Sequence, residues 1–578
     1  MKRIGRIFRN LVEYSPHLSV ILAVLGILPL VFFLRNVDAG ASVALLFGGA
    51  ILLALSNLLA FLTVDRHKIH FLFVLFVTTF FLITMYDIRF GVLQGSDIVW
   101  EYTSARITLN ENAWLLSRAS LGDRYFTAAS ISLFPAVVSK VTGLDLMPIF
   151  QWILRAVLAI LPLAIFQTVQ EIFGEIKLSA LSALIFAQFY FNFNLLNFLI
   201  RQGVAELFLV LTIFSLVKLS RAKSKRLAYA SLVAISFFGL VIGHYTLNYW
   251  SILMICGIFL LCFIIGYLPK KLLSLLKLSN LRTEKPIIDS VFLVFYIAVS
   301  SAWIYFTSFV PFLIDIHNEL YLFMDSNGAA NVSSNVAQTS WFLNNPAGPV
   351  VGFWLDFTLV LIPLGFLYVI FKVRKRSINM PWIGGGLVML VVLGFWVMAG
   401  SRMLGLYVDR IIVIGAIFFT TFMAICVLLV NKKLRIFAIV FLLINLPLNM
   451  LVPSYQRYVL YRPEESVPAS IAIIQRIIRV PEFTASVWLD QNAINNSTFQ
   501  TDFLNEWFYA YFNVTIVYSE TPPINNTGTY FLLDYYNLRY GMWQGPVSIL
   551  NFSVSDSLSN SCIVYSNGDA AIIARLDR

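Results

Sequence analysis

The chain has 578 residues, a net charge of +11 and a pI near 9.3; 59% of its residues are hydrophobic and only 12% are charged. A mean hydropathy of +0.81 lies outside the range of soluble globular domains. The composition therefore excludes an ordinary soluble enzyme and indicates a polytopic membrane protein. Most basic residues lie in short loops between apolar runs, so membrane topology explains the positive charge better than a nucleic-acid partner does.

Apolar runs of the length that crosses a bilayer, about 20 residues, recur through the first 452 residues. We therefore predict an all-α membrane domain of about 13 transmembrane helices at residues 1–452, followed by a small α/β domain at residues 453–578. The predicted spans are Leu18–Leu34, Ala41–Thr63, Phe71–Tyr86, Met147–Phe173, Leu178–Phe193, Val204–Leu219, Leu227–Gly243, Trp250–Leu268, Ile287–Val310, Val350–Phe371, Pro381–Gly400, Ile411–Val430 and Ile436–Val452. The first span lacks a small-residue cleavage site and is expected to be retained.

Among the short loops between the spans, only Arg201, Arg402 and Arg410 depart from a pattern in which the lysines and arginines lie in alternate loops. This pattern places those alternate loops and the amino terminus in the cytoplasm. The two long loops at residues 87–146 and 311–349, and the carboxy-terminal domain, then lie outside. The glycosylation sequons agree with this orientation, since all of them fall on the predicted outer side: Asn331, Asn495, Asn496, Asn513, Asn525 and Asn551. We expect a multi-pass protein of the cell membrane with an extracytoplasmic carboxy-terminal domain.

The first outer loop is expected to contain short interfacial helices near Trp114–Leu116 and Ile131–Val138. In the tail, a helix is expected at Ala469–Arg479, and Asn567-Gly568 is a typical hairpin turn. Runs rich in β-branched and aromatic residues predict strands at Val514–Tyr518, Thr529–Leu533, Ile563–Tyr565 and Ala570–Ala574. Gly384-Gly385-Gly386 lies within an apolar run and indicates close packing of helices.

Ionisable and polar residues near the outer ends of spans are candidate functional residues, because a charge inside a bilayer costs about 2.5–3.5 kcal/mol on insertion scales. The candidates are Asp97, Glu101, Arg201, Glu206, His244, Tyr245, Arg402 and Arg410. Asp97 and Glu101 are four residues apart and share a helix face. Such carboxylates can hold a metal or provide a general base, although they can also be the solvated edge of a helix.

Each of the other candidates has a simpler explanation. Arg201 and Glu206 can form a structural ion pair, and His244 can be a hydrogen-bonded structural residue. Arg402 and Arg410 have planar groups suited to phosphate, but they can also contact anionic lipid headgroups. The sequence contains no phosphate-binding Gly-rich loop, metalloprotease helix motif or nucleophile elbow.

Four segments carry a resemblance to a known family: Gly95–Tyr102, Leu133–Pro135, Arg201–Glu206 and Gly243–Thr246. With the predicted topology they resemble the GT-C superfamily of membrane glycosyltransferases, and more narrowly its uncharacterised archaeal members. The resemblance implies that Asp97 acts as general base on an acceptor hydroxyl, while a sugar leaves its polyprenyl phosphate with inversion. Glu101 is a second catalytic candidate.

The resemblance also implies that Arg402 or Arg410 holds the donor phosphate. The implied partners are the lipid bilayer, a polyprenyl-phosphate-linked sugar donor and a glycan, lipid or protein acceptor, without nucleic acid. No cofactor is certain, and a divalent metal ion remains open.

One motif departs from the family. Oligosaccharyltransferases of the superfamily carry Trp-Trp-Asp-Tyr-Gly, whereas this tail offers only Asp534-Tyr535-Tyr536 or Arg539-Tyr540-Gly541. The preferred hypothesis is therefore transfer of a monosaccharide. An oligosaccharyltransferase-like enzyme, a lipid or solute transporter or flippase, and a non-catalytic assembly or cell-surface protein are the alternatives.

Overall fold

The computed structural model describes most of the first 267 residues and shorter stretches beyond them. The described ranges are 2–36, 42–90, 93, 96–116, 124–189, 200–222, 224–267, 290–307, 360–369, 385–391, 404–429, 441, 443–447 and the seven strands between 498 and 575. The predicted helix at Ala469–Arg479 and the second outer loop at residues 311–349 fall outside these ranges.

The chain divides into two compact units. Unit 1 contains Met1–Met85, Trp114–Ser130 and Ile153–Glu465, and unit 2 contains Tyr86–Ala113, Ile131–Trp152 and Ser466–Arg578. Parts of the long loop at residues 87–146 thus belong to the same unit as the tail. The domain boundary at residue 453 remains a prediction.

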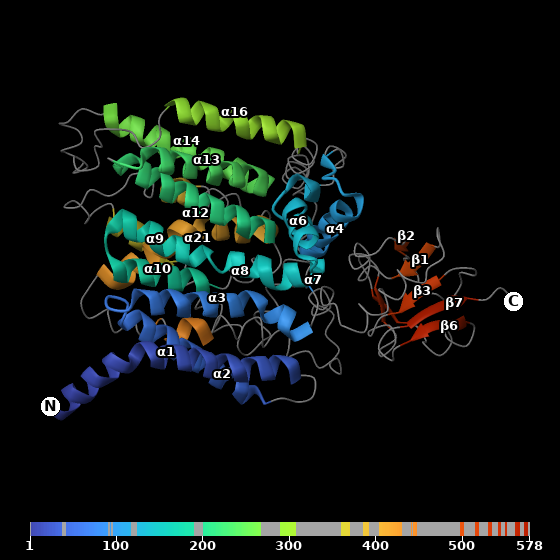
Figure 1. Ribbon diagram of the computed structural model, residues 1–578, viewed down its shortest axis with the longest axis horizontal. Coiled ribbons are helices and arrows are strands. Elements are labelled where there is room, and N and C mark those ends of the chain that lie inside the picture. Colours follow the sequence, from blue (N-terminus) through green and yellow to red (C-terminus); the bar gives the residue numbers. More distant parts are fainter. Residues whose placement is uncertain are drawn as a thin grey trace. The chain divides into compact units, whose positions relative to one another are not determined.

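Unit 1 is helical. Its helices are α1 (Lys2–Asn36), α2 (Val43–Leu62), α3 (Lys68–Phe90, to Met85 in this unit), the 3₁₀ turn η2 (Arg124–Thr127), α8 (Arg155–Leu158), α9 (Leu161–Phe173), α10 (Ile176–Gln188), α12 (Ile200–Arg221), α13 (Arg226–Gly243), α14 (Tyr245–Tyr267), α16 (Ser290–Thr307) and α21 (Leu404–Leu429). Figure 1 shows α9, α12, α13 and α14 side by side, and both α9 and α13 pack against α12. The long apolar runs therefore form a bundle of adjacent helices.

Six helices among the described residues are long and apolar enough to cross a membrane. They are Pro16–Asn36, Ala44–Leu62, Lys68–Met85, Leu146–Phe173, Ile200–Arg221 and Arg226–Gly243. Each coincides with one of the predicted spans, which confirms a helical membrane protein. Several other predicted spans contain shorter apolar helices, such as Val291–Thr307 and Ile414–Leu428. The full number of thirteen extends into residues that the structure does not describe.

The structure adds one detail to the predicted spans and corrects another. The fourth span is not a uniform helix, because the π-helix η3 (Ile149–Leu154) precedes α8, and α9 starts only at Leu161. π-Helical turns inside α-helices are uncommon and often lie at functional positions. Asp409 and Arg410, expected in a loop before the twelfth span, lie inside α21.

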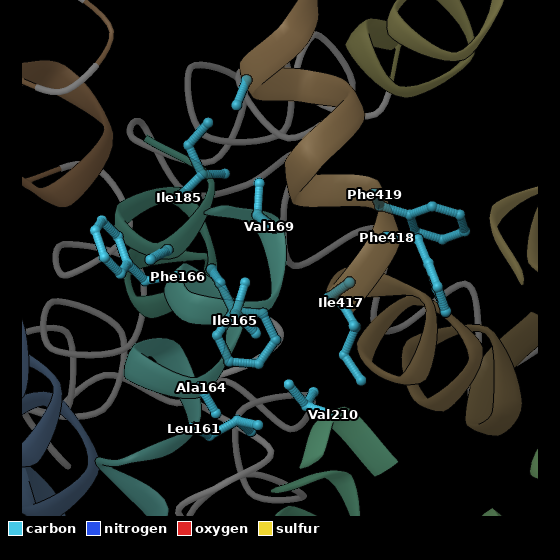
Figure 2. Packing of buried hydrophobic residues seen from close by; sticks show 14 of the residues in the cluster. Leu161, Ala164, Ile165, Phe166, Val169, Ile185, Val210, Ile417, Phe418 and Phe419 are labelled. Atoms are coloured by element: carbon cyan, nitrogen blue, oxygen red, sulfur yellow. The ribbon is translucent and has the colours of Figure 1, made fainter. Parts of the chain in front are cut away.

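The core of unit 1 is made of apolar side chains from helices that are distant in the sequence. Figure 2 shows Phe166 and Val169 of α9 close to Ile185 of α10, with Val210 of α12 and Ile417 of α21 nearby. Each buried side chain of this size contributes about 1.5–3 kcal/mol when it is removed from water. For helices in a bilayer, however, the packing contacts themselves supply most of the association energy.

The glycine run behaves as predicted where it is described. A methyl group on Gly385 would lie 2.6 Å from the ring of Phe418, and one on Gly386 would lie 2.4 Å from the ring of Phe422. Only the absence of a side chain leaves room for these two rings. The glycines therefore allow α21 to pack closely against residues 385–391.

Unit 2 contains α4 (Ser96–Glu111), α6 (Leu133–Thr142), α7 (Leu146–Pro148) and most of η3. Helix α6 confirms the predicted helix at Ile131–Val138, and it ends at Gly143, whose φ of 72° is a common helix-terminating conformation. The ring of Tyr102 in α4 contacts Phe150, with centroids 5.5 Å apart. Of the predicted helix near Trp114–Leu116, in unit 1, Leu116 has helical backbone and Trp114 does not, and residues 117–123 lie outside the described residues.

The tail contains strands β1 (Thr498–Thr501), β2 (Thr515–Tyr518), β3 (Tyr530–Leu533), β4 (Met542–Gln544), β5 (Ile549–Asn551), β6 (Ser561–Ser566) and β7 (Ala571–Arg575). Five of them form a sheet in the order β2-β1-β3-β7-β6, while β4 and β5 pair separately. The pairs β1–β2 and β1–β3 are parallel, whereas β3–β7 and β6–β7 are antiparallel. The four predicted strands correspond to β2, β3, β6 and β7. The predicted turn at Asn567-Gly568 lies outside the described residues.

Candidate functional site

A segment of the first long loop covers the ends of three helices in unit 1. The capping segment, defined here as residues 114–116 and 124–130, donates from the backbone N–H of Ala129 to the carbonyl of Ile242 at 3.0 Å. The hydroxyl of Ser130 donates to the carbonyl of Gly243 at 3.2 Å. Both acceptors are carbonyls of the last turn of α13, which have no partner within the helix. These bonds fix the capping segment to the end of α13.

Trp114 extends the same contact to α16. Its indole Nε1 donates to the carbonyl of Phe126 at 2.9 Å, and its ring lies 6.1 Å from that of Trp303. Ring separations in this range are favourable for aromatic pairs. The capping segment is therefore held at both of its described ends by named contacts.

Gly243 brings the last turn of α13 against the first turns of α12. A methyl group on Gly243 would lie 3.2 Å from Cβ of Ala205 and 3.4 Å from its Cα. Glu206 follows Ala205 in the chain, and His244 follows Gly243, so the carboxylate and the imidazole belong to the same level of the bundle.

His244 also begins α14. Its Nδ1 accepts from the backbone N–H of Leu247 at 3.1 Å, and its carbonyl accepts from the N–H of Asn248 at 3.0 Å. This is the role of an N-cap side chain. Because Nδ1 is an acceptor, the neutral ring carries its proton on Nε2 and is a donor there. His244 is thus a hydrogen-bonded residue, as its simpler explanation predicts, and the ring keeps a defined tautomer.

Arg201 lies in the first turn of α12 and is only 1% exposed. Its guanidinium carbon is 4.4 Å from the centroid of the Tyr125 ring, which belongs to the capping segment. A cation above an aromatic face stabilises a protein by about 0.5–2 kcal/mol, and the upper end of this range applies when the pair is removed from water. Tyr125 therefore holds the arginine in the low-dielectric end of the bundle.

Glu206 forms a different contact from the predicted ion pair with Arg201. One turn away on the same helix, Gln202 donates from Nε2 to Glu206 Oε1 at 3.0 Å. Both side chains are buried, as is Asn248 in the first turn of α14. We use the name buried polar cluster for the six polar and aromatic residues that are buried at this end of unit 1: Tyr125, Arg201, Gln202, Glu206, His244 and Asn248.

The buried polar cluster lies at one end of the membrane helices. Helix α12 has 22 residues, which is about 33 Å at 1.5 Å per residue and matches a bilayer core of about 30 Å. Its opposite end carries surface ion pairs, with Lys218 2.6 Å and Arg221 3.5 Å from the carboxylate of Glu171. A cation, a carboxylate and an imidazole buried at the other end of a span are the groups expected to bind a polar ligand from the membrane.

The predicted site residues fall into two groups. Arg201, Glu206 and His244 are all buried at the same end of the helix bundle in unit 1. Asp97 is the second residue of α4 and Glu101 is one turn further along, both in unit 2. Glu101 is 0% exposed, so the solvated-edge explanation is wrong for this carboxylate.

The remaining predicted residues are less completely described. Tyr245 is the first residue of α14, and Arg410 lies in α21, but the structure describes only their backbone. Arg402 lies outside the described residues. Within the described part of the chain, no group of three or more His, Cys, Asp and Glu side chains is arranged to hold a metal ion.

Comparison with solved structures finds the archaeal oligosaccharyltransferase AglB from Archaeoglobus fulgidus, in complex with an inhibitory peptide and a dolichol-phosphate. The TM-score is 0.43 and the sequence identity 10%, over 82% of this chain and 70% of that chain. No protein-family model matches the sequence. No curated protein matches it either.

Sequence reasoning missed Arg155, Tyr125 and Asn248. Arg155 is 1% exposed in α8, directly after the π-helix, and α8 packs against α12. The signal for Arg155 was present, because any arginine within an apolar span is a functional candidate. Asn248 is four residues after His244 and so shares its helix face. Tyr125 has no such local signal, since only tertiary structure brings it to Arg201.

Proposed function

We propose that this protein transfers a sugar from a polyprenyl-phosphate-linked donor to an acceptor hydroxyl on the outer face of the membrane. The observation that carries the proposal is the burial of Arg201 against Tyr125 at the end of a membrane-spanning helix. A guanidinium held in this way is suited to the phosphate of a lipid that remains in the bilayer. Arg402 and Arg410 are further proposed ligands of the donor phosphate.

The neighbouring groups suit the polar head of such a donor. Glu206 supplies a carboxylate acceptor, and the Nε2–H of His244 supplies a donor. Tyr245, which follows His244, is proposed to bind the substrate as well. The apolar surfaces of the helices face the hydrocarbon, where a polyprenyl chain is soluble, so one lipid can keep its chain in the membrane and its phosphate at the cluster.

Asp97 is proposed as the general base and Glu101 as a catalytic carboxylate beside it on the same helix. In the proposed reaction the base removes the proton of the acceptor hydroxyl, and the acceptor oxygen attacks the anomeric carbon. The bond to the phosphate oxygen breaks with inversion, and polyprenyl phosphate leaves. A positioned base typically contributes about 10²–10⁴-fold to such a rate.

The proposal is tested with full-length protein in lipid nanodiscs. The donors are radiolabelled dolichyl-phosphate glucose and dolichyl-phosphate mannose, and a membrane extract supplies acceptors. Wild-type protein should move label from the donor to other material. Asp97→Asn should lower that rate by at least ~100-fold and leave the binding of dolichyl phosphate unchanged. Asp145→Asn, which alters an exposed carboxylate of the same loop, is the matched control.

The same preparation separates the alternatives. A flippase would move labelled lipid between leaflets of proteoliposomes without breaking the sugar–phosphate bond. An oligosaccharyltransferase-like enzyme would place label on asparagine. Transfer by Asp97→Asn at the wild-type rate would refute the assignment of the base.

A further inference from the structure

Two members of the buried polar cluster retain unused hydrogen-bonding groups. Among the described residues, Glu206 Oε2 has no hydrogen-bond partner, and neither the oxygen nor the nitrogen of the Asn248 side-chain amide has one. Both side chains are 0% exposed. A buried polar atom without a partner costs about 1–3 kcal/mol. Native proteins therefore seldom keep such atoms unless a ligand or an ordered water completes them.

Glu206 and Asn248 lie at the same end of the helix bundle. Helices α12 and α14 pack against each other. The contact of Gly243 with Ala205 places the start of α14 beside the first turns of α12. Glu206 and Asn248 each lie within the first two turns of their helices. The side-chain atoms of Glu206 and Asn248 that have no hydrogen-bond partner among the described residues therefore lie at the same end of unit 1 as Arg201.

Their chemistry matches adjacent hydroxyl groups. An amide offers two N–H donors and a carbonyl acceptor, and a carboxylate oxygen accepts. A sugar hydroxyl both donates and accepts, so two neighbouring hydroxyls can satisfy the amide and the carboxylate together. A bare phosphate cannot, because its oxygens only accept and a carboxylate repels them.

We propose that Glu206 and Asn248 bind hydroxyl groups of the sugar on the lipid-linked donor and thereby determine which donors are accepted. This inference rests on the proposed function. It assigns the sugar to Glu206 and Asn248 and leaves the phosphate to Arg201.

The test measures equilibrium binding to the full-length protein in nanodiscs. The probes are radiolabelled dolichyl phosphate, dolichyl-phosphate glucose and dolichyl-phosphate mannose. Wild-type protein should bind at least one of the sugar-bearing probes more tightly than dolichyl phosphate. Asn248→Leu and Glu206→Gln should each weaken binding of that probe about tenfold, as expected for one good hydrogen bond, and leave binding of dolichyl phosphate within about twofold.

Matched controls lie on the same two helices. Cys256→Ala changes α14 two turns further along, and Thr212→Val removes a hydroxyl that bonds only to the carbonyl of Phe208 within α12. Both should bind all probes as the wild type does. If Asn248→Leu does not fold, Asn248→Asp keeps the size of the side chain and removes its donors, and the same loss is expected.

The outcomes distinguish the two proposals. If the wild type binds none of the probes, the proposed function itself fails. If it binds them but the variants match it, or if they lose all probes equally, the sugar-binding role of Glu206 and Asn248 is wrong and the donor site stands. Equal affinity of the wild type for dolichyl phosphate and for both sugar-bearing probes would also overturn the inference.

Discussion

The guanidinium of Arg201 lies over the ring of Tyr125, with its central carbon 4.4 Å from the ring centroid. The two residues are 76 positions apart, one in the capping segment and the other in the first turn of α12. Their contact joins a loop to a buried cation at the end of a membrane helix. It is the relationship on which donor binding depends in the proposed mechanism.

Tyr125→Leu should weaken binding of dolichyl phosphate. Leucine has no π-face, and a cation–π contact contributes about 0.5–2 kcal/mol, which is about 2–30-fold in Kd. Tyr125→Phe keeps the face and should retain most of the affinity. Titration of labelled dolichyl phosphate into nanodiscs measures both, and equal affinity of the leucine and phenylalanine variants would show that the ring has no such role.

Arg201→Lys should lower the affinity for dolichyl phosphate although it preserves the charge. An ammonium group lacks the planar fork that binds two phosphate oxygens at once and stacks on an aromatic ring. We expect a loss of about tenfold, corresponding to about 1.4 kcal/mol. Arg221→Lys, at the opposite end of α12, is the matched control and should bind normally. A lysine variant that binds as tightly as the wild type would restrict the role of Arg201 to its charge.

Gly243→Val should destabilise the protein, because its side chain would collide with Ala205. Overpacking of this kind typically costs about 1–3 kcal/mol. Thermal unfolding in detergent should show a lower Tm, and the double variant Gly243→Ala with Ala205→Gly should unfold at a higher temperature than Gly243→Ala alone. Independent effects of the two substitutions would argue against direct contact between α12 and α13 at this point.

Trp114→Phe should loosen the capping segment. It removes the hydrogen bond from Nε1 to the carbonyl of Phe126 but keeps an aromatic ring for Trp303. The net loss of one such bond is about 0.5–1.5 kcal/mol. Hydrogen exchange of residues 124–130 should be faster than in the wild type, while exchange in α9 stays the same. Unchanged exchange in the capping segment would mean that other contacts hold it.

Sequence reasoning predicted the elements whose signal is local. Long runs of apolar residues identified the six membrane helices, and short apolar runs between turn signals identified β2, β3, β6 and β7. It also selected Arg201, Glu206 and His244 as residues at the same depth in the membrane. Charged residues are rare in spans, and all three residues lie near the predicted outer ends of their spans.

The partners of these residues were not predictable. The sequence suggested an ion pair between Arg201 and Glu206, but the carboxylate accepts from Gln202 and the arginine lies over Tyr125. Choosing between these contacts requires the packing of the capping segment, which rests on backbone bonds such as that from Ala129 to Ile242. Backbone hydrogen bonds between distant segments leave no pattern in side-chain type. The π-helix before Arg155 is equally invisible to a count of apolar residues.

In the proposed function, the protein transfers sugar from a polyprenyl-phosphate donor and Asp97 is the base. The most direct measurement follows the label of dolichyl-phosphate glucose and dolichyl-phosphate mannose in nanodiscs that contain either the wild type or Asp97→Asn. We predict transfer of at least one of the two sugars by the wild type, and loss of at least ~100-fold in the variant at unchanged binding of dolichyl phosphate. Transfer by the variant at the wild-type rate would contradict the role of Asp97, and absence of transfer by a wild type that binds the donor would contradict the proposed function.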